Sequence, residues 1–451
     1  MHHDFLVPNL LSRVEEFKSP DSWVHLGEHL NHPGDNNGRR LPIRLGIDFG
    51  TAFTKVAYNI ADKVDFVEWS GVRKVADASD GYFLPGEMST TEDESVVLGN
   101  CPTKISLLNN LKNPFLGDKL GACRIISCNG KELRLTPDRF DVPDFSPIVV
   151  FVAWIFRYTR AWIYKKHKAI LAGRKIAYQV NFGMPSCDFS WKYENEYQKI
   201  VSSAWNLSQF NEKYFTLKTA GRLLEGNNTQ NESGLDSLDL IPEFVAQIAG
   251  YIQSPQYRND LHMFFDVGAG TIDVSLFSLY KKQTGYNYAI LSSQVKPLGT
   301  CFLEIAKNKT AGDQSVSIDG FAKNVIAALR KTFYDGKNKC SELYKLAEKS
   351  GLPIFRSGGG VVDQLYQTAS DIVNFAPEAK IKLLDMGDQI FDRVDLTGEE
   401  LRKNSKRLSV AYGLTFDKDA IMSRLVTPDK ISSDSNPPKV RTYDHNEIYS
   451  K

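Results

Sequence analysis

The sequence predicts an α/β protein built from two similar lobes, on three observations. Segment 41–58 reads as a strand, a glycine-containing turn and a second strand, and segment 263–279 repeats this pattern far along the chain. Between the two copies, 145–167 has apolar residues at helical spacing, and 175–185 reads as a buried strand ended by glycine and proline. Strands and helices therefore alternate, which is typical of helices packed on mixed sheets.

The repeated unit is a β-hairpin with an acidic residue two positions before a glycine. The first copy stops at Asp48 and Gly50, and the second at Asp266 and Gly268. A repeat at this distance indicates two lobes that each contribute one hairpin. Two unrelated β-hairpins remain the alternative.

Composition and charge exclude several classes of function. The 451 residues are 42% hydrophobic and 24% charged, which allows more than one core. The 55 basic and 54 acidic residues create no broad positive field, so we expect no nucleic-acid partner. No apolar run reaches the roughly 20 residues of a membrane span, and no basic-then-apolar leader begins the chain. We therefore expect no membrane insertion and a cytoplasmic location, in keeping with six scattered cysteines.

We expect four regions along the chain. Residues 1–40 form an N-terminal extension that ends in a loop rich in Pro, Gly, Asn and Asp. Residues 41–255 form the first lobe, to which 404–425 return, and 256–403 form the second lobe. Residues 426–451, rich in Ser, Asp, Asn, Pro and Lys, form a polar tail.

The glycine turns of both hairpins suit a phosphate-binding site. A residue without a Cβ lets backbone N–H groups approach a phosphate and permits positive φ. Nearby hydroxyls add donors, and carboxylates stand where they would hold Mg²⁺, mostly through its retained waters. The candidate phosphate contacts are Gly50, Thr51, Gly268, Ala269, Gly270 and Thr271, and the candidate Mg²⁺ carboxylates are Asp48, Asp266 and Asp273.

A third glycine segment lies at 354–361. An apolar strand runs there into Ser357, Gly358, Gly359 and Gly360, and an apolar-periodic stretch follows. This order predicts a strand, a tight turn and a helix start, whose N–H groups and positive helix end would face the sugar and α-phosphate of a nucleotide. A plain glycine loop is the alternative.

These motifs, in this order, resemble the superfamily of actin, 70-kDa heat-shock chaperones and sugar kinases. GIDFGTAFTKVAY resembles its first phosphate hairpin, FFDVGAGTIDVSLF its second and FRSGGG its adenosine loop, while IPEFVAQIAGY and RLSVAYGLTF resemble the two connecting helices of the chaperone branch. The resemblance implies the actin-like ATPase fold, with duplicated ribonuclease H-like lobes and a nucleotide cleft between them. It is closest to the nucleotide-binding domain of the chaperones, and we expect no peptide-binding domain.

The resemblance also implies roles for single residues. Asp48 and Asp266 match the carboxylates beneath the metal, and Thr51 and Thr271 match hydroxyls near the β- and γ-phosphates. Glu243 matches the glutamate that helps to order attacking water and metal. The catalytic set is thus Lys112, Glu243, Asp266 and Thr271, where Lys112 comes from ISLLNNLKNPFLG and Lys104 is the alternative register.

The first hairpin carries two further residues of the family pattern. Ala52 lies in the phosphate turn, and Lys55 resembles a lysine of actin that touches phosphate. Two departures stand out: Val361 and Val362 replace the Ser-Thr-Arg that follows the glycines in the chaperones, and Ala269 replaces a glycine. The usual arginine stack on adenine is therefore not expected from this loop.

Small residues punctuate both connecting helices. Ala246 and Gly250 lie one turn apart in the first, and the second contains Ala411 and Gly413. Small side chains there would let two helices cross closely and pivot. The alternative is that both are core helices without a hinge.

We therefore expect a switch that binds ATP or ADP with Mg²⁺ and hydrolyses ATP slowly. An unidentified protein partner would read lobe closure, and the protein would act as a monomer or an ATP-dependent oligomer. An actin-like filament, favoured by Lys55, and a small-molecule kinase of the same fold are the alternatives. A dinucleotide-binding enzyme is disfavoured, because 273–276 continue as a strand where a helix would be required.

Overall fold

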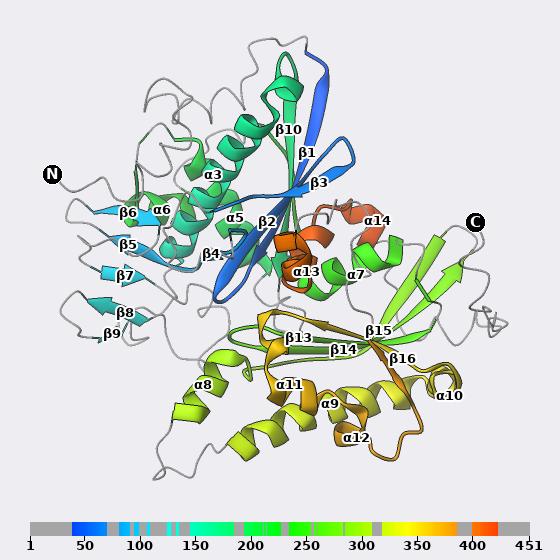
Figure 1. Cartoon of the computed structure of the whole chain (residues 1–451). Coiled ribbons are helices and arrows are strands. Elements are labelled where there is room, and N and C mark those ends of the chain that lie inside the picture. The colour runs from blue at the N-terminus through cyan, green and yellow to red at the C-terminus, as the bar shows by residue number, and fades with distance from the viewer. Residues whose placement is uncertain are drawn as a thin grey trace.

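The computed structural model is a mixed α/β protein with three β-sheets and helices packed on them (Figure 1). Lys104, Lys112 and the parts of the chain before 38 and after 422 lie outside the described residues. Within the described part, no helix is both long and apolar enough to cross a membrane. The structure describes residues 38–422 except for 70–80, 91–93, 99–105, 109–123, 128–131, 135–144, 185–193, 211, 213, 227–233, 254–256, 259, 283–284, 309–317 and 386–398.

The first sheet contains the N-terminal hairpin at its centre. Its strand order is β12-β10-β1-β2-β3, and β4 (Leu84–Pro85) pairs with the start of β2. β1, β2 and β3 pair antiparallel, whereas β10 and β12 run parallel to β1. The five main strands are β1 (Arg40–Phe49), β2 (Phe53–Ile60), β3 (Lys63–Phe66), β10 (Lys175–Met184) and β12 (Leu235–Pro242).

The second sheet has the same strand order and the same directions as the first. Its order is β15-β14-β13-β16-β17, with β13, β14 and β15 antiparallel and β16 and β17 parallel to β13. The similarity of the two hairpins thus extends to two whole sheets. The strands are β13 (Leu261–Val267), β14 (Ile272–Lys282), β15 (Gly285–Lys296), β16 (Leu352–Ser357) and β17 (Leu383–Asp385).

Helices occupy matching places in the two halves of the chain. α3 (Ser146–Leu171) precedes β10 as α9 (Ile318–Lys339) precedes β16. α7 (Glu243–Gln253) follows β12, and α13 (Glu399–Gly413) follows β17; these two helices lie between the two sheets (Figure 1). The predicted alternation of strands and helices is therefore confirmed.

A third sheet of short strands lies beside the first one. Its order is β11-β6-β5-β7-β8-β9, and all of its strands except β11 are inserted between β3 and α3. Segments this short carry no readable periodicity, which is why the sequence does not predict this sheet. The strands are β5 (Met88–Thr90), β6 (Ser95–Leu98), β7 (Ser106–Leu108), β8 (Arg124–Ser127), β9 (Glu132–Arg134) and β11 (Phe215–Thr216).

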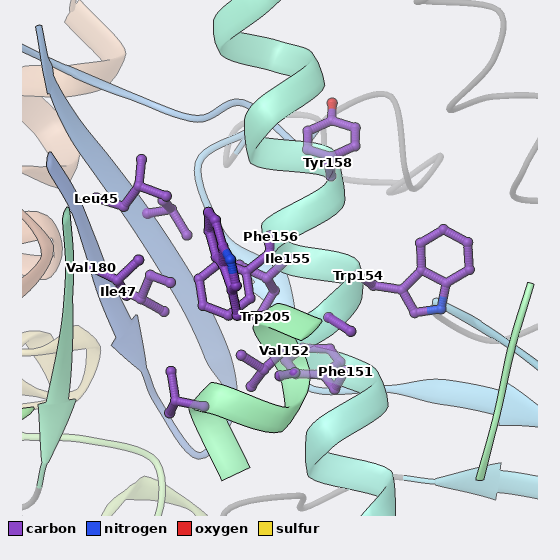
Figure 2. Close-up of a cluster of buried hydrophobic side chains, with 14 of the residues drawn as sticks. Leu45, Ile47, Phe151, Val152, Trp154, Ile155, Phe156, Tyr158, Val180 and Trp205 are labelled. Carbon is purple, nitrogen blue, oxygen red and sulfur yellow. The ribbon is translucent and has the colours of Figure 1, made fainter. Parts of the chain in front are cut away.

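Helix α3 is buried on all sides from Ser146 to Ala161, as the apolar sequence there predicts, whereas most of its last turns are more exposed. On one side it faces the first sheet, with Trp205 of α5 (Glu194–Ser208) packed between α3 and the strands that carry Leu45 and Val180 (Figure 2). On the other side Trp154 points away from those strands, and its indole N–H donates to the Val96 carbonyl of the third sheet, 3.1 Å away.

Two arginines of α3 are buried and bind backbone oxygens. The Arg157 guanidinium donates to the carbonyls of Phe210 and Glu212, and Arg160 donates to the carbonyl of Ser208, the last residue of α5. Burial lowers the pKa of Arg157 to about 9 and that of Arg160 to about 10, so both stay charged at neutral pH. These donors cap the carbonyl end of α5.

The crossing of α7 and α13 brings two backbones into contact. A Cβ at Gly413 would lie 1.6 Å from the Ala246 carbonyl oxygen, and one at Gly46 of β1 would lie 2.4 Å from the Ala411 carbonyl oxygen. The expected close crossing of the two helices is therefore observed at Ala246 and Gly413, whereas Ala411 approaches β1. Around it, a buried cluster takes residues from α7, α13 and both large sheets, including Ala57 and Phe264.

We expect Gly413→Ala to lower the free energy of unfolding by about 3 kcal/mol, because one methyl group must push α7 and α13 apart. Gly221→Ala is the matched control: Gly221 lies in α6 (Leu217–Leu224), and the nearest atom to its added Cβ is Ser146 Oγ at 3.3 Å. That change should shift stability by less than about 1 kcal/mol. Urea denaturation of both variants measures the difference, and equal stabilities would refute the packing constraint at Gly413.

Candidate functional site

A cavity of about 390 Å³ lies where the two hairpin turns approach each other. The first turn joins β1 to β2 and the second joins β13 to β14. The two turns touch, because a Cβ at Gly270 would lie 3.1 Å from Thr51 Oγ1 and 3.3 Å from its methyl carbon. A larger residue at 270 would therefore separate the turns.

The glycine segment after β16 forms a third wall of the cavity. Gly358 has a φ of +85°, and a Cβ there would lie 2.2 Å from Asp266 Oδ1, so this position requires glycine. The predicted order of strand, tight turn and helix start is observed, and the turn is the 3₁₀ turn Gly359–Val362. α11 (Gln364–Ala369) then begins after Asp363, whose side chain accepts from the Leu365 N–H as an N-cap.

One backbone donor of this segment is already used. The Gly358 N–H donates to the Lys406 carbonyl of α13 at 3.3 Å. This N–H therefore ties the glycine segment to α13, and α11 is a helix of only six residues that begins several positions later. The sequence predicts that the positive end of this helix dipole faces the nucleotide. The dipole of α11 is small, because a short helix sums few peptide dipoles.

Most of the residues expected at the site line this one cavity. They come from four separate segments of the sequence. Of the expected residues, Gly270 does not line the cavity but contacts Thr51 beside it, and Lys112 lies outside the described residues. The lining residues among those expected are Asp48, Gly50, Thr51, Ala52, Lys55, Glu243, Asp266, Gly268, Ala269, Thr271, Asp273, Ser357, Gly358, Gly359 and Gly360.

An ion pair stands on the first hairpin. β1 and β2 pair so that Asp48 and Lys55 lie directly opposite each other, and Lys55 Nζ lies 2.8 Å from Asp48 Oδ2. Both side chains are largely buried, at 6% and 16% exposed. The lysine charge is thereby fixed at the cavity wall beside the hairpin turn.

The two carboxylate oxygens of Asp266 have different surroundings. Its Oδ2 accepts from Gln247 Nε2 at 3.0 Å, while Oδ1 is buried and accepts no hydrogen bond from the residues that the structure describes. Burial, together with nearby Glu243 and Asp48, raises the pKa of Asp266 to about 6, although Lys55 and the Gln247 hydrogen bond limit the rise. A buried, unsatisfied anionic oxygen at a cavity wall suits a hydrated cation or another donor.

The carboxylates do not form a compact metal cage. Among the residues that the structure describes, no group of three or more His, Cys, Asp or Glu lies close enough to hold a metal ion. Asp48, Asp266 and Asp273 nevertheless line the same cavity. This spread fits Mg²⁺, which keeps several waters and takes few direct protein ligands, better than it fits a transition metal.

The cavity also contains residues that the sequence analysis missed. Gln247 could have been noticed as a polar residue between apolar residues of α7, whereas no sequence pattern sets Arg407 apart from the other cations of α13. The missed lining residues are Phe53, Gln247, Arg407, Val410 and, at the start of α8 (Thr300–Asn308), Thr300 and Cys301.

Gln247 connects two walls of the cavity. Its amide nitrogen donates to Asp266 Oδ2 and, at 3.2 Å, to Ser357 Oγ. Ser357 Oγ in turn donates to the Lys406 carbonyl at 2.7 Å. Both amide hydrogens of Gln247 are thus engaged, and they fix the direction in which the Asp266 carboxylate points.

We expect Asp266→Asn to raise the free energy of unfolding at neutral pH but not near pH 4. The folded-state pKa of about 6 lies above the ordinary value of 3.8. Between these pH values the folded protein keeps a proton that the unfolded chain has lost, so the wild type loses stability as pH rises and the Asn variant does not. The difference should reach about 2 to 3 kcal/mol at pH 7.

Urea unfolding at a series of pH values measures this difference. Asp62→Asn, in an exposed turn, is the matched control for the loss of a carboxylate. A difference between Asp266→Asn and the wild type that stays constant from pH 4 to pH 7 would contradict the raised pKa of Asp266.

We expect Gln247→Leu to destabilise the protein by about 1 to 3 kcal/mol at pH 7, because the ionised Asp266 loses its donor. The loss should shrink near pH 4, where Asp266 is protonated. Gln367→Leu, on the exposed face of α11, should change stability little at either pH. An equal loss for Gln247→Leu at both pH values would assign Gln247 a packing role alone.

Comparison with known proteins adds no family to these observations. A scan against models of protein families gives no match for this chain, and a search of curated proteins gives no similar sequence. The function of the cavity is therefore inferred from its own residues.

Proposed function

We propose that this protein binds Mg-ATP and hydrolyses it slowly as a molecular switch of the actin-like ATPase superfamily, most similar to the nucleotide-binding domain of 70-kDa heat-shock chaperones. One observation carries the proposal: two sheets of the same strand order each present a glycine hairpin to a single cavity. In this proposal the sheets belong to two ribonuclease H-like lobes, and the cavity is the nucleotide cleft between them.

The glycine turns support phosphate binding at the hairpin end of the cavity. Gly50 and Gly268 line the cavity with backbone atoms alone, and the hydroxyls of Thr51 and Thr271 add donors. Lys55 brings a fixed positive charge to the same wall. The glycine segment after β16 would then lie along the sugar and α-phosphate.

The charges of the cavity support a divalent cation. Among its lining residues Lys55 and Arg407 are basic, whereas Asp48, Glu243, Asp266 and Asp273 are acidic. A triphosphate carries negative charge of its own, so four carboxylates would repel it unless a cation intervened. The three aspartates would hold Mg²⁺ mainly through its waters, and Mg²⁺ would supply charge neutralisation at the phosphates.

Glu243 supports hydrolysis rather than binding alone. It is the first residue of α7, and its side chain reaches the cavity. In the proposed role its carboxylate orients the attacking water, and because α7 crosses α13, a change in the crossing would shift Glu243 relative to the hairpins. A protein partner would read that change, whether the protein acts as a monomer or as an ATP-dependent oligomer. The scattered cysteines agree with a cytoplasmic location for such a switch.

Calorimetric titration of the full chain with ATP, ADP and GTP, with and without Mg²⁺, tests the proposal. We expect ATP and ADP to bind with Mg²⁺, and Asp266→Ala to weaken this binding by a few kcal/mol while the protein stays folded. Absence of binding of any nucleotide would refute the proposed function. Unchanged affinity in a folded Asp266→Ala protein would refute the metal role of Asp266.

We expect Lys112→Ala to slow single-turnover ATP hydrolysis by roughly 10²-fold while it changes nucleotide affinity much less. A lysine near the γ-phosphate stabilises charge that grows in the transition state, whereas the hairpins and Lys55 also support the ground state. Lys104→Ala is the comparison. If only Lys104→Ala slows ATP hydrolysis, the catalytic lysine is Lys104. If both variants hydrolyse ATP at the wild-type rate, neither lysine is catalytic.

A further inference from the structure

Arg407 of α13 reaches the cavity from the side of the glycine segment. A Cβ placed on Gly359 would lie 3.4 Å from Arg407 Nε, so the guanidinium occupies the space beside that turn. The guanidinium carbon lies 3.7 Å from the ring centre of Phe83 and 5.5 Å from that of Phe53, and Phe53 also lines the cavity. Arg407 thus lies between the glycine segment and the aromatic rings of Phe53 and Phe83.

The backbone around Arg407 is fixed to the glycine segment. The carbonyl of Lys406, the preceding residue, accepts from Ser357 Oγ at 2.7 Å and from the Gly358 N–H at 3.3 Å. Ser409 Oγ also lies 3.1 Å from Ser357 Oγ. The backbone next to Arg407 is therefore bound to the glycine segment by hydrogen bonds that involve no residue of the first hairpin.

The guanidinium of Arg407 lies over the ring of Phe83. An arginine stacked on an aromatic face keeps its N–H donors in the plane of the group, at its edge, where they match two oxygens of a phosphate. Lys55, the other basic residue among those lining the cavity, is paired with Asp48 on the hairpin wall. The two cations therefore serve different ends of the cavity.

We infer that Arg407 is a ligand-binding residue of this cavity and that it recognises the phosphate nearest the sugar of a bound nucleotide. The inference rests on the proposed function. Its grounds are the place of Arg407 beside Gly359, the stack on Phe83 and the anchorage of its backbone to Ser357 and Gly358. A phosphate next to the sugar is common to ATP and ADP, so Arg407 contributes to the binding of both.

The test is a calorimetric or competition titration of the full chain with ATP, ADP and adenosine in the presence of Mg²⁺. Arg407→Met should weaken the binding of ATP and of ADP by the same factor, about 10- to 100-fold, and leave the affinity for adenosine unchanged. Arg407→Lys keeps the charge but loses the planar fork, so both of its affinities should fall between those of the wild type and of Arg407→Met.

Arg402→Met is the matched control, because Arg402 lies exposed on the same helix and does not line the cavity. It removes the same charge from α13 and should bind all three ligands as the wild type does. Thermal unfolding shows whether each variant is folded, and Arg407→Lys carries the test should Arg407→Met unfold.

Four results would overturn the inference. Unchanged ATP and ADP affinities in folded Arg407 variants would exclude a ligand contact. A loss of affinity for ATP alone would place the contact at the γ-phosphate. An equal loss of affinity for adenosine would indicate a contact with the sugar or base. A wild-type protein that binds none of the three ligands would instead refute the proposed function and, with it, this inference.

Discussion

The contact between Gly413 of α13 and the Ala246 carbonyl of α7 sets the arrangement of the two large sheets. Each helix follows the last parallel strand of one sheet, so the distance between the two helix backbones fixes how the sheets face each other. The same crossing places the polar residues of the cavity. Gln247 is the next residue after Ala246, and Arg407 lies about two helical turns before Gly413. A wider crossing would move both side chains away from the hairpin turns.

A buried polar chain continues from this crossing into the cavity. It runs from Asp266 through Gln247 and Ser357 to the Lys406 carbonyl and joins β13, α7, the glycine segment and α13. Such a chain is stable only when each member has its partner. Asp266 Oδ1 is the exception, and it lies at the cavity wall. The unsatisfied oxygen is thus located where a ligand, rather than the protein, would complete the network.

The parts of the fold that the sequence predicts are those with local signals. Both hairpins follow from strand alternation around Asp48 and Asp266, and α3 follows from its apolar run. The third sheet is missed because its strands are too short for a period, whereas the strand, turn and helix start around Gly358 follow from three glycines between two apolar segments. Gln247 and Arg407 are missed for a different reason: tertiary packing of α7 and α13 brings them to the cavity, and a single sequence does not encode that packing in any local pattern.

The electrostatics of the cavity link its occupancy to the stability of the fold. Burial raises the pKa of Asp266 to about 6, nearby Glu243 and Asp48 add to the rise, and Lys55 limits it. In the ligand-free protein the charge of ionised Asp266 opposes folding at neutral pH. A bound cation would favour the ionised carboxylate and remove that opposition, so binding would stabilise the folded state by more than its contacts alone. An unsatisfied buried carboxylate would only destabilise a purely structural core. In a binding site, a ligand that contacts the carboxylate would remove this cost.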